Sequence, residues 1–243
     1  MTGKRLLDIA LASAALIILS PVIALLMLAV SSDGGPPIYG GIRAGRGNRD
    51  FTMFKLRTMS IGSERAGGTS TARSDPRVTV VGRYLRRWKL DELPQFWNVL
   101  TGDMSLVGPR PNTRRGGVDR YTADEMRLLT VRPGITDLSS IVFSDEGDIL
   151  DGAADPDAAY DRLIRPWKSE LGLLYIDRRS FAVDLRIIAL TALAVVSRPA
   201  ALRGVGRLLR RLDASPALIA VCRRAAPLPF SNAREQAGCG FIS

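Results

Sequence analysis

The chain has 243 residues and a formal net charge of +10, with no histidine and only two cysteines, Cys222 and Cys239. The lack of histidine excludes Ser-His and Cys-His catalysis and histidine-ligated zinc sites. Two cysteines late in the chain cannot form a disulfide framework, which fits a reducing, cytosol-facing location. The basic balance indicates a polyanionic partner, and composition leaves open whether this is nucleic acid, an anionic membrane surface or a phosphorylated substrate.

Residues 9–30 form an uncharged, apolar segment. A straight helix of this length would measure about 33 Å, enough to cross a bilayer. Ser20 and Pro21 lie in its middle. A proline inside a helix removes one backbone hydrogen bond and kinks the helix. The segment therefore predicts a membrane helix with a bend at Ser20-Pro21.

Basic residues flank this segment on both sides. They are Lys4 and Arg5 before it and Arg43, Arg46, Arg49 and Lys55 after it. Basic flanks tend to stay in the cytoplasm, so both ends favour the same side of the membrane. A re-entrant helix, which enters, bends and returns, satisfies both ends. A plain spanning helix and a cleaved signal peptide are the alternatives, the latter with Lys4-Arg5 as its basic start and residues 29–31 as its small-residue cleavage site.

A β-hairpin is predicted after a turn-rich linker at residues 31–37. Residues 51–57 alternate as a strand does, and we expect the turns around it at Gly40-Gly41 and at residues 45–48. Helical patterns follow at residues 80–88 and after Asp91, which is a natural N-cap. The second helix would have its apolar face at Leu93, Phe96, Trp97 and Leu100, Pro94 in its first turn and Gly102 at its end.

The second half of the chain is predicted to be mostly helical. Residues 158–174 read as helix interrupted or restarted at Pro166. Residues 184–196 and 206–212 are apolar or amphipathic with basic ends, which is typical of helices that lie in a membrane interface. No clear pattern appears from about Ala214. The predicted fold class is α+β and helix-dominated, with an N-terminal re-entrant membrane helix, a small β-hairpin and interfacial amphipathic helices.

Asp91 and Glu92 are the first candidates for chemistry. Acidic residues are common in the first turn of a helix because they complement the macrodipole, and for an isolated pair this is the simpler interpretation. Here Arg86, Arg87 and Lys89 lie within five residues and favour the ionised form of Asp91. An ionised carboxylate can attack phosphorus or hold Mg²⁺.

Cationic residues suited to phosphate lie on either side of this pair. Pro109 and Pro111 stiffen the backbone around Arg110, and a stiff guanidinium suits bidentate phosphate recognition. Lys55 and Arg57 fall two residues apart on one face of the predicted strand, either as a solvated face or as a second anion clamp. A surface turn with a solvated arginine is the alternative for Arg110.

Several segments in order resemble the bacterial sugar transferases, the monotopic polyprenyl-phosphate phosphoglycosyl transferases, in their short form. The resemblance covers about residues 4–198 and rests on these segments: Lys4-Arg5 with Asp8, Ser20-Pro21, 54–59 (FKLRTM), 75–79 (DPRVT) with Gly82-Arg83 and Leu85-Arg86, 90–95 (LDELPQ) with 98–100 (NVL), 102–111 (GDMSLVGPRP), 132–136 (RPGIT), and Phe181 with Asp184-Leu185. So many ordered motifs make the resemblance specific.

The resemblance implies a reaction at a membrane. Sugar 1-phosphate would pass from a nucleotide diphospho-sugar, usually a UDP-sugar, to undecaprenyl phosphate, as the first step of surface glycan assembly. Asp91 would be the nucleophile and would lie on or near a Mg²⁺ ion, with Glu92 assisting. Arg110 would bind phosphate between Pro109 and Pro111, and Arg86, Lys55 and Arg57 would be further phosphate or substrate contacts. Ser20 and Pro21 would set the membrane bend.

The resemblance also implies an organisation and a location. Residues 1–31 would be the re-entrant helix, 32–198 the catalytic domain and 199–243 a basic tail of unknown role. The protein would work at the cytoplasmic face of the bacterial inner membrane, with lipid but no nucleic acid as partner, and a homodimer is one open alternative. Residues 137–140 (DLSS) depart from the family pattern, which leaves the sugar open. A membrane-tethered binder of nucleic acid or anionic lipid and a catalytically inactive scaffold are the rival functions.

Overall fold

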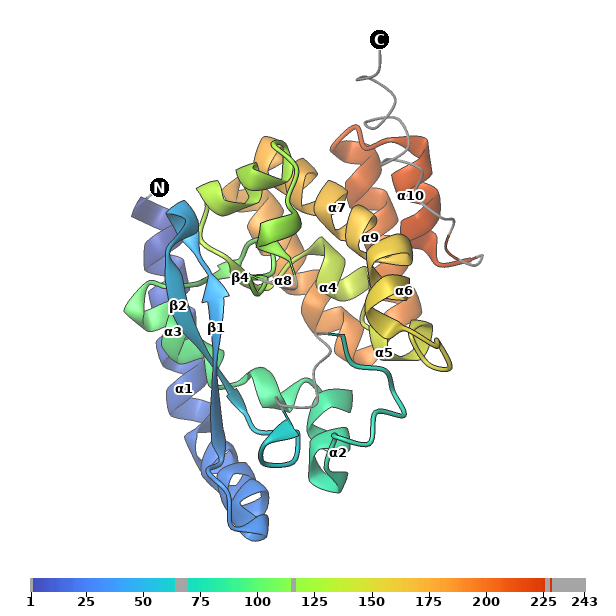
Figure 1. Ribbon diagram of the computed structural model, residues 1–243. Helices are drawn as coiled ribbons and strands as arrows, with labels where there is room; N and C mark the ends of the chain where they lie inside the picture. Colours follow the sequence, from blue (N-terminus) through green and yellow to red (C-terminus); the bar gives the residue numbers. More distant parts are fainter. Residues whose placement is uncertain (1, 64–69, 115–116, 226–227, 229–243) are drawn as a thin grey trace.

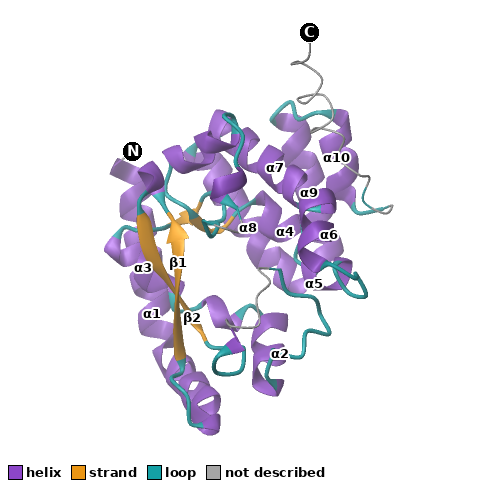
Figure 2. Ribbon diagram, in the orientation of Figure 1, coloured by secondary structure: helices purple, strands orange, loops and turns teal. Residues whose placement is uncertain are grey.

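The computed structural model describes residues 2–63, 70–114, 117–225 and 228. Its α-helices are α1 (Thr2–Val30), α2 (Val80–Arg87), α3 (Gln95–Thr101), α4 (Leu138–Val142), α5 (Glu146–Ile149), α6 (Pro156–Leu163), α7 (Arg165–Arg178), α8 (Phe181–Val196), α9 (Arg198–Arg211) and α10 (Pro216–Arg223). The strands are β1 (Ile38–Ala44), β2 (Asp50–Leu56), β3 (Ser105–Val107) and β4 (Gly134–Thr136). Short 3₁₀ turns are η1 (Ser31–Asp33), η2 (Arg46–Asn48), η4 (Leu90–Glu92), η5 (Val118–Arg120) and η6 (Glu125–Thr130). The predicted helix-dominated α+β class is confirmed (Figure 2).

The helix α1 runs along one side of the molecule (Figure 1). In the described part of the chain it is the one helix long and apolar enough to cross or enter a membrane, and Ile17, Ile18 and Leu28 are highly exposed on it. It stays helical through Pro21. Pro21 cannot donate to the carbonyl of Ile17, four residues earlier. The Ser20 hydroxyl donates to that same oxygen at 2.9 Å and satisfies it.

Polar side chains tie the first turns of α1 to the rest of the protein. Lys4 donates to the carbonyl of Val107 and to Asp184, both at 2.8 Å, and the Asp8 carboxylate accepts from the Ser105 hydroxyl at 2.8 Å. Arg5 donates to the carbonyls at the end of α3. These turns are part of the folded domain, which argues against the signal-peptide alternative.

The other end of α1 is tied to the same domain through Arg57. Its guanidinium pairs with Asp33 and donates to the carbonyls of Val30 at 3.0 Å and Pro36 at 2.8 Å. Val30 also packs with Leu56 and Leu85 in a small apolar cluster. Because both ends of α1 contact one domain, the helix lies alongside that domain instead of projecting from it.

The predicted hairpin is formed by β1 and β2, which pair antiparallel from Ile38 opposite Leu56 to Ala44 opposite Asp50. The turn at residues 45–48 is where the sequence predicts it, but the turn expected at Gly40-Gly41 is wrong, because both glycines lie inside β1. The side chain of Asn98 fixes α3 to β2: it donates to the Thr52 carbonyl at 2.7 Å and accepts from the Phe54 amide at 3.0 Å.

The helices around Asp91 differ in detail from the prediction. Thr79 caps α2 by accepting from the Gly82 amide at 2.9 Å. Asp91 is not the N-cap of the next helix, because residues 90–92 form the short turn η4 and α3 starts only at Gln95, after Pro94. Leu93 and Pro94, between the two, keep right-handed helical backbone angles, so Asp91 lies in a tighter turn that leads directly into α3. Gly102 ends α3 as predicted.

The main core lies under the short parallel pair β3–β4, where Ser105 is opposite Gly134 and Val107 opposite Thr136. The buried side chains of α4, α7, α8, α9 and α10 meet there, including Leu138, Leu171, Ile187, Leu209 and Cys222. Burial raises the pKa of the Cys222 thiol to about 12, whereas Cys239 lies outside the described residues. The break at Pro166 is confirmed by the two helices α6 and α7.

Residues 199–223 of the predicted tail are structured. The helix α9 packs against α8 and α10, and Val205, Leu209 and Leu218 are fully or almost fully buried in the main core. No pattern from about Ala214 predicted α10. The helix has only 8 residues, too few to show a clear helical period, and the burial of its apolar side chains depends on the neighbouring helices α7 and α9.

Candidate active site

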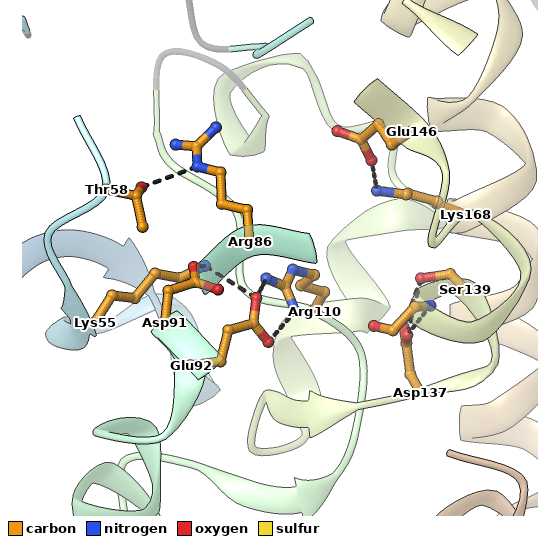
Figure 3. A network of polar contacts seen from close by, with 11 residues as sticks. Lys55, Thr58, Arg86, Asp91, Glu92, Arg110, Asp137, Ser139, Glu146 and Lys168 are labelled. Atoms are coloured by element: carbon orange, nitrogen blue, oxygen red, sulfur yellow. Dashed lines mark hydrogen bonds and ion pairs between the residues drawn. The ribbon is translucent and has the colours of Figure 1, made fainter. Parts of the chain in front are cut away.

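Asp91 and Glu92 lie together in η4, facing Lys55 on β2 (Figure 3). The Lys55 ammonium is 3.0 Å from Glu92 Oε1 and 3.7 Å from Asp91 Oδ2. Asp91 is 6% exposed, and no described residue donates a hydrogen bond to its side chain. Its carboxylate is therefore held near a cation and keeps its oxygens available for another partner.

Glu92, in contrast, is engaged on both oxygens. Arg110 contacts Glu92 Oε1 and donates to Oε2 at 3.2 Å, forming a two-point ion pair (Figure 3). Burial alone would raise the pKa of Glu92, but the charges of Arg110, Lys55 and Lys89 outweigh it and hold that pKa well below its usual range. Glu92 is thus a fixed anion that orients Arg110 and Lys55.

The end of β3 positions Arg110. Gly108 and Gly134 pass so close that a Cβ on Gly134 would lie 2.1 Å from the Gly108 nitrogen. This close approach, followed by Pro109 and Pro111, sets the direction in which the chain leaves the sheet. Glu92 raises the pKa of Arg110, so the guanidinium is a permanent cation. The predicted rigid arginine is therefore present, and it faces the carboxylate pair.

Arg86 reaches the same region from α2. Its Nε donates to the Thr58 hydroxyl at 2.9 Å (Figure 3). The helix can lie this close because residue 82 is glycine: a Cβ there would come within 2.1 Å of the Thr58 carbonyl oxygen. With Lys55, Lys89 and Arg110, Arg86 makes four cations around two carboxylates. This surplus of positive charge suits a ligand that carries two or more negative charges.

A second polar group lies on the other side of Arg110 (Figure 3). The Asp137 side chain caps α4 by accepting hydrogen bonds from the Ser140 amide at 2.6 Å and from the Ser139 hydroxyl. Its negative charge also helps to raise the pKa of Arg110. Lys168 of α7 pairs with Glu146. Burial alone would lower the pKa of Lys168, but nearby Tyr160 and Glu146 outweigh it and raise that pKa. The hydroxyl of Ser140 is buried without a partner among the described residues.

Sequence reasoning identified the first group but missed most of the second. The structure brings Asp91, Glu92, Lys55, Arg86 and Arg110 into one region, and their roles stay predictions. Lys168 and Glu146 carry no local signal, because their pairing joins positions 22 residues apart in two different helices. The one available signal was the departure at residues 137–140, which marks the start of α4.

Three other predicted residue sets lie apart from this cluster or beside it. Arg57 is 8% exposed and is bound to Asp33 and to backbone carbonyls near the end of α1, so the structure does not bring it to Asp91. Pro109 and Pro111 flank Arg110 in the chain and line a small crevice behind it. Ser20 and Pro21 lie in the exposed middle of α1.

Few of the described carboxylates near Asp91 are available to a metal ion. Among the described residues, no group of three or more carboxylates or cysteines could hold a metal ion on its own. Mg²⁺ commonly binds through one or two carboxylates together with substrate phosphates and water. The free oxygens of Asp91 fit that kind of site, whereas Glu92 is already occupied by Arg110 and Lys55.

The chain is similar in sequence to several bacterial transferases. A family model described as bacterial sugar transferase matches residues 1–198. A galactosyl transferase of Streptococcus agalactiae is 35% identical over 207 residues, covering 81% of this chain and 42% of that protein. An undecaprenyl-phosphate glucose phosphotransferase of Komagataeibacter xylinus is 39% identical over 198 residues, covering 79% and 35%.

A third relative has a more detailed name. The UDP-glucose:undecaprenyl-phosphate glucose-1-phosphate transferase of Escherichia coli K12 is 38% identical over 192 residues, which are 77% of this chain and 39% of that protein. The chain thus spans less than half the length of each of these three relatives.

Proposed function

The chain belongs to the bacterial sugar transferase family, and from this we propose that it transfers a sugar 1-phosphate from a UDP-sugar to undecaprenyl phosphate. Similar proteins are named as undecaprenyl-phosphate sugar phosphotransferases, which supports the acceptor and the type of group transferred. The single observation that carries the proposal is the contrast between Asp91 and Glu92. Two adjacent buried carboxylates share one cationic surrounding, but only Asp91 has free oxygens.

In the proposed reaction Asp91 is the nucleophile. One oxygen of its carboxylate attacks the β-phosphorus of the donor, the bond from that phosphorus to the bridging oxygen breaks, and UMP leaves. The sugar phosphate is then bound covalently to Asp91. A phosphate oxygen of the lipid attacks the same phosphorus, the bond to Asp91 breaks, and the carboxylate is restored together with a polyprenyl diphosphate sugar.

The surrounding cations have separate tasks in this scheme. Lys55 lies against both carboxylates and would offset the charge repulsion that opposes attack of Asp91 on a diphosphate. Glu92 holds Arg110 in a fixed orientation, so that its guanidinium can bind phosphate with little loss of side-chain freedom. Arg86 would contact the diphosphate from the α2 side. Mg²⁺, held by Asp91 and the substrate, would supply further charge neutralisation.

The contacts of α1 support a re-entrant arrangement. Lys4 and Arg5 at its start and Val30 at its end all contact the catalytic domain. A helix that crossed the bilayer would carry one of its ends to the opposite face, away from that domain. We therefore place α1 in one leaflet and the catalytic domain on the cytoplasmic face of the inner membrane, where undecaprenyl phosphate and a UDP-sugar can both reach Asp91.

Replacement of the nucleophile tests this function. Asp91→Asn should lower lipid-dependent UMP release by at least about 10,000-fold, because the amide is a very poor nucleophile. The assay uses detergent-purified protein, Mg²⁺, undecaprenyl phosphate and a panel of UDP-sugars. Asp103→Asn, which removes an exposed carboxylate outside the Asp91 cluster, is the matched control and should retain activity.

Intact-mass measurement provides a second readout. With the donor and without the lipid acceptor, the unmodified protein should gain the mass of one sugar phosphate, and Asp91→Asn should gain none. Undiminished turnover by Asp91→Asn would refute the assignment of the nucleophile. Inactivity of the unmodified protein with every nucleotide-sugar donor offered would favour the scaffold alternative.

A further inference from the structure

A groove between α8 and α9 carries positive charge at its edges. Its volume is about 270 Å³, and its lining includes Ala189, Leu190, Leu208, Arg186, Arg207 and Arg211. The two helices approach closely at Gly204, where a Cβ would lie 2.3 Å from Leu190 Cδ2. The groove therefore has an apolar floor from both helices and three guanidinium groups around it.

These three arginines have no anionic partner among the described residues. Within the described part of the chain, no ion pair or side-chain hydrogen bond involves Arg186, Arg207 or Arg211, and all three are exposed. Neighbouring arginines behave differently: Arg198, at the start of α9, and Arg224, after α10, both pair with Asp145. Three uncompensated cations around one groove repel one another, so an anionic ligand would relieve that repulsion.

An exposed apolar stripe on α8 adjoins the groove. Phe181, Leu185, Leu193 and Val196 are 51%, 42%, 36% and 85% exposed, respectively. Their spacing of three, four or eight residues places them on one side of the helix. Ala189 lies between Leu185 and Leu193 on this side and also lines the groove. The stripe and the cationic groove are thus continuous at Ala189.

We propose that this groove binds an anionic phospholipid of the membrane in which α1 is embedded. The phosphodiester lies between Arg207 and Arg211 of α9 and Arg186 of α8, and an acyl chain runs along the exposed stripe of α8. A soluble anion would leave the stripe uncovered, and a zwitterionic lipid would compensate the three cations less well. The site does not include Asp91 or its neighbours, and α9 begins where the family match ends.

Matched arginine pairs on α9 test the proposal. Arg207 and Arg211 line the groove, whereas Arg203 and Arg210 are also exposed on the same helix but do not line it. The full chain in detergent is titrated with phosphatidylglycerol or phosphatidylcholine, and bound lipid is counted by native mass spectrometry. We expect Arg207→Gln/Arg211→Gln to weaken phosphatidylglycerol binding at least about tenfold, and Arg203→Gln/Arg210→Gln to change it less than about twofold.

The remaining outcomes either support or overturn the proposal. Arg186→Gln, on the opposite wall, should weaken binding in the same direction, and an unchanged melting temperature shows that each variant is folded. Equal losses in the two α9 pairs would reveal general charge attraction and overturn the groove. Preference for undecaprenyl phosphate over phosphatidylglycerol, or competition by millimolar inorganic phosphate, would also overturn it. None of these readouts depends on transferase activity.

Discussion

Two sites of this protein hold arginine side chains in different ways: at one the guanidinium is paired with a carboxylate, and at the other no described carboxylate pairs with it. Arg110 is held by Glu92 through a two-point ion pair, beside the buried Asp91. Arg186, Arg207 and Arg211 stand exposed without a carboxylate partner in the described part of the chain. The first arrangement fixes a guanidinium in position before a ligand arrives, as phosphoryl transfer requires. The second places three guanidinium groups around one groove and leaves their charge to an anionic lipid headgroup, as the proposed phospholipid site requires.

This difference shows that a carboxylate partner fixes the orientation of a guanidinium, whereas an unpaired guanidinium keeps its charge available to a ligand. At the proposed active site, Glu92 lowers the local charge surplus but fixes Arg110 and Lys55, so the gain is in orientation. At the groove, no described carboxylate pairs with the three arginines, and the full charge of each arginine is available to a mobile lipid. Net charge of the whole chain, +10, describes neither arrangement.

Among the charge substitutions that separate the two sites, loss of Arg110 should have the largest effect on kcat/KM. Arg110→Gln removes a phosphate contact and leaves Glu92 with Lys55 as its remaining close partner, so we expect kcat/KM for the UDP-sugar to fall about 100-fold or more. Arg203→Gln removes the same charge on an exposed helix face and should change kcat/KM by less than about twofold. Similar losses in both variants would mean that total charge, and not the position of Arg110, controls donor use.

The sequence predicted those features whose causes are local. The hairpin followed from alternation at residues 51–57, and the end of α3 followed from Gly102. Asp91, Glu92 and Arg110 were found because they lie in short ordered motifs. Asp91 was nevertheless misassigned as a helix N-cap, because local propensity could not predict that the chain would form the separate turn η4 before α3.

Features that depend on tertiary contacts escaped prediction. Lys168 of α7 and Glu146 of α5 meet only in the folded chain, and Arg57 pairs with Asp33 only because the end of α1 lies next to the end of β2. A strand pattern placed Arg57 on the same face as Lys55, but β2 ends at Leu56 and the chain changes direction there. The groove on α8 and α9 likewise needs two helices that are separate in the sequence pattern.

The ion pair at Glu92 should make stability depend on pH. The pKa of Glu92 is held well below its ordinary 4.5 in the folded protein, so its stabilising contribution is complete above about pH 4.5 and is lost as pH falls towards the lowered value. Glu92→Gln should lower the free energy of unfolding by about 3 kcal/mol at pH 7, because it leaves the Arg110 guanidinium without its carboxylate partner.

Chemical denaturation of both proteins from pH 7 down to pH 3 measures this effect. The difference in free energy of unfolding between the unmodified protein and Glu92→Gln should be constant above pH 5 and should become smaller below about pH 4.5. A gap that widens on acidification would have the wrong sign for a carboxylate with a lowered pKa. Asp103→Asn, at an exposed position, gives the pH dependence expected when no buried ion pair is lost.

The smallest expected effect concerns salt. The Debye length falls from about 10 Å at 0.1 M to about 3 Å at 1 M ionic strength, and exposed charges are screened more than buried ones. Phosphatidylglycerol binding at Arg186, Arg207 and Arg211 should therefore weaken several-fold between 0.1 M and 0.5 M NaCl. Over the same range, the ratio of kcat/KM between the unmodified protein and Arg110→Gln should change less than about twofold. If that kcat/KM ratio fell with salt as strongly as lipid binding, Arg110 would act as an exposed, solvated charge. Its two-point pairing with Glu92 would then not explain its contribution to activity.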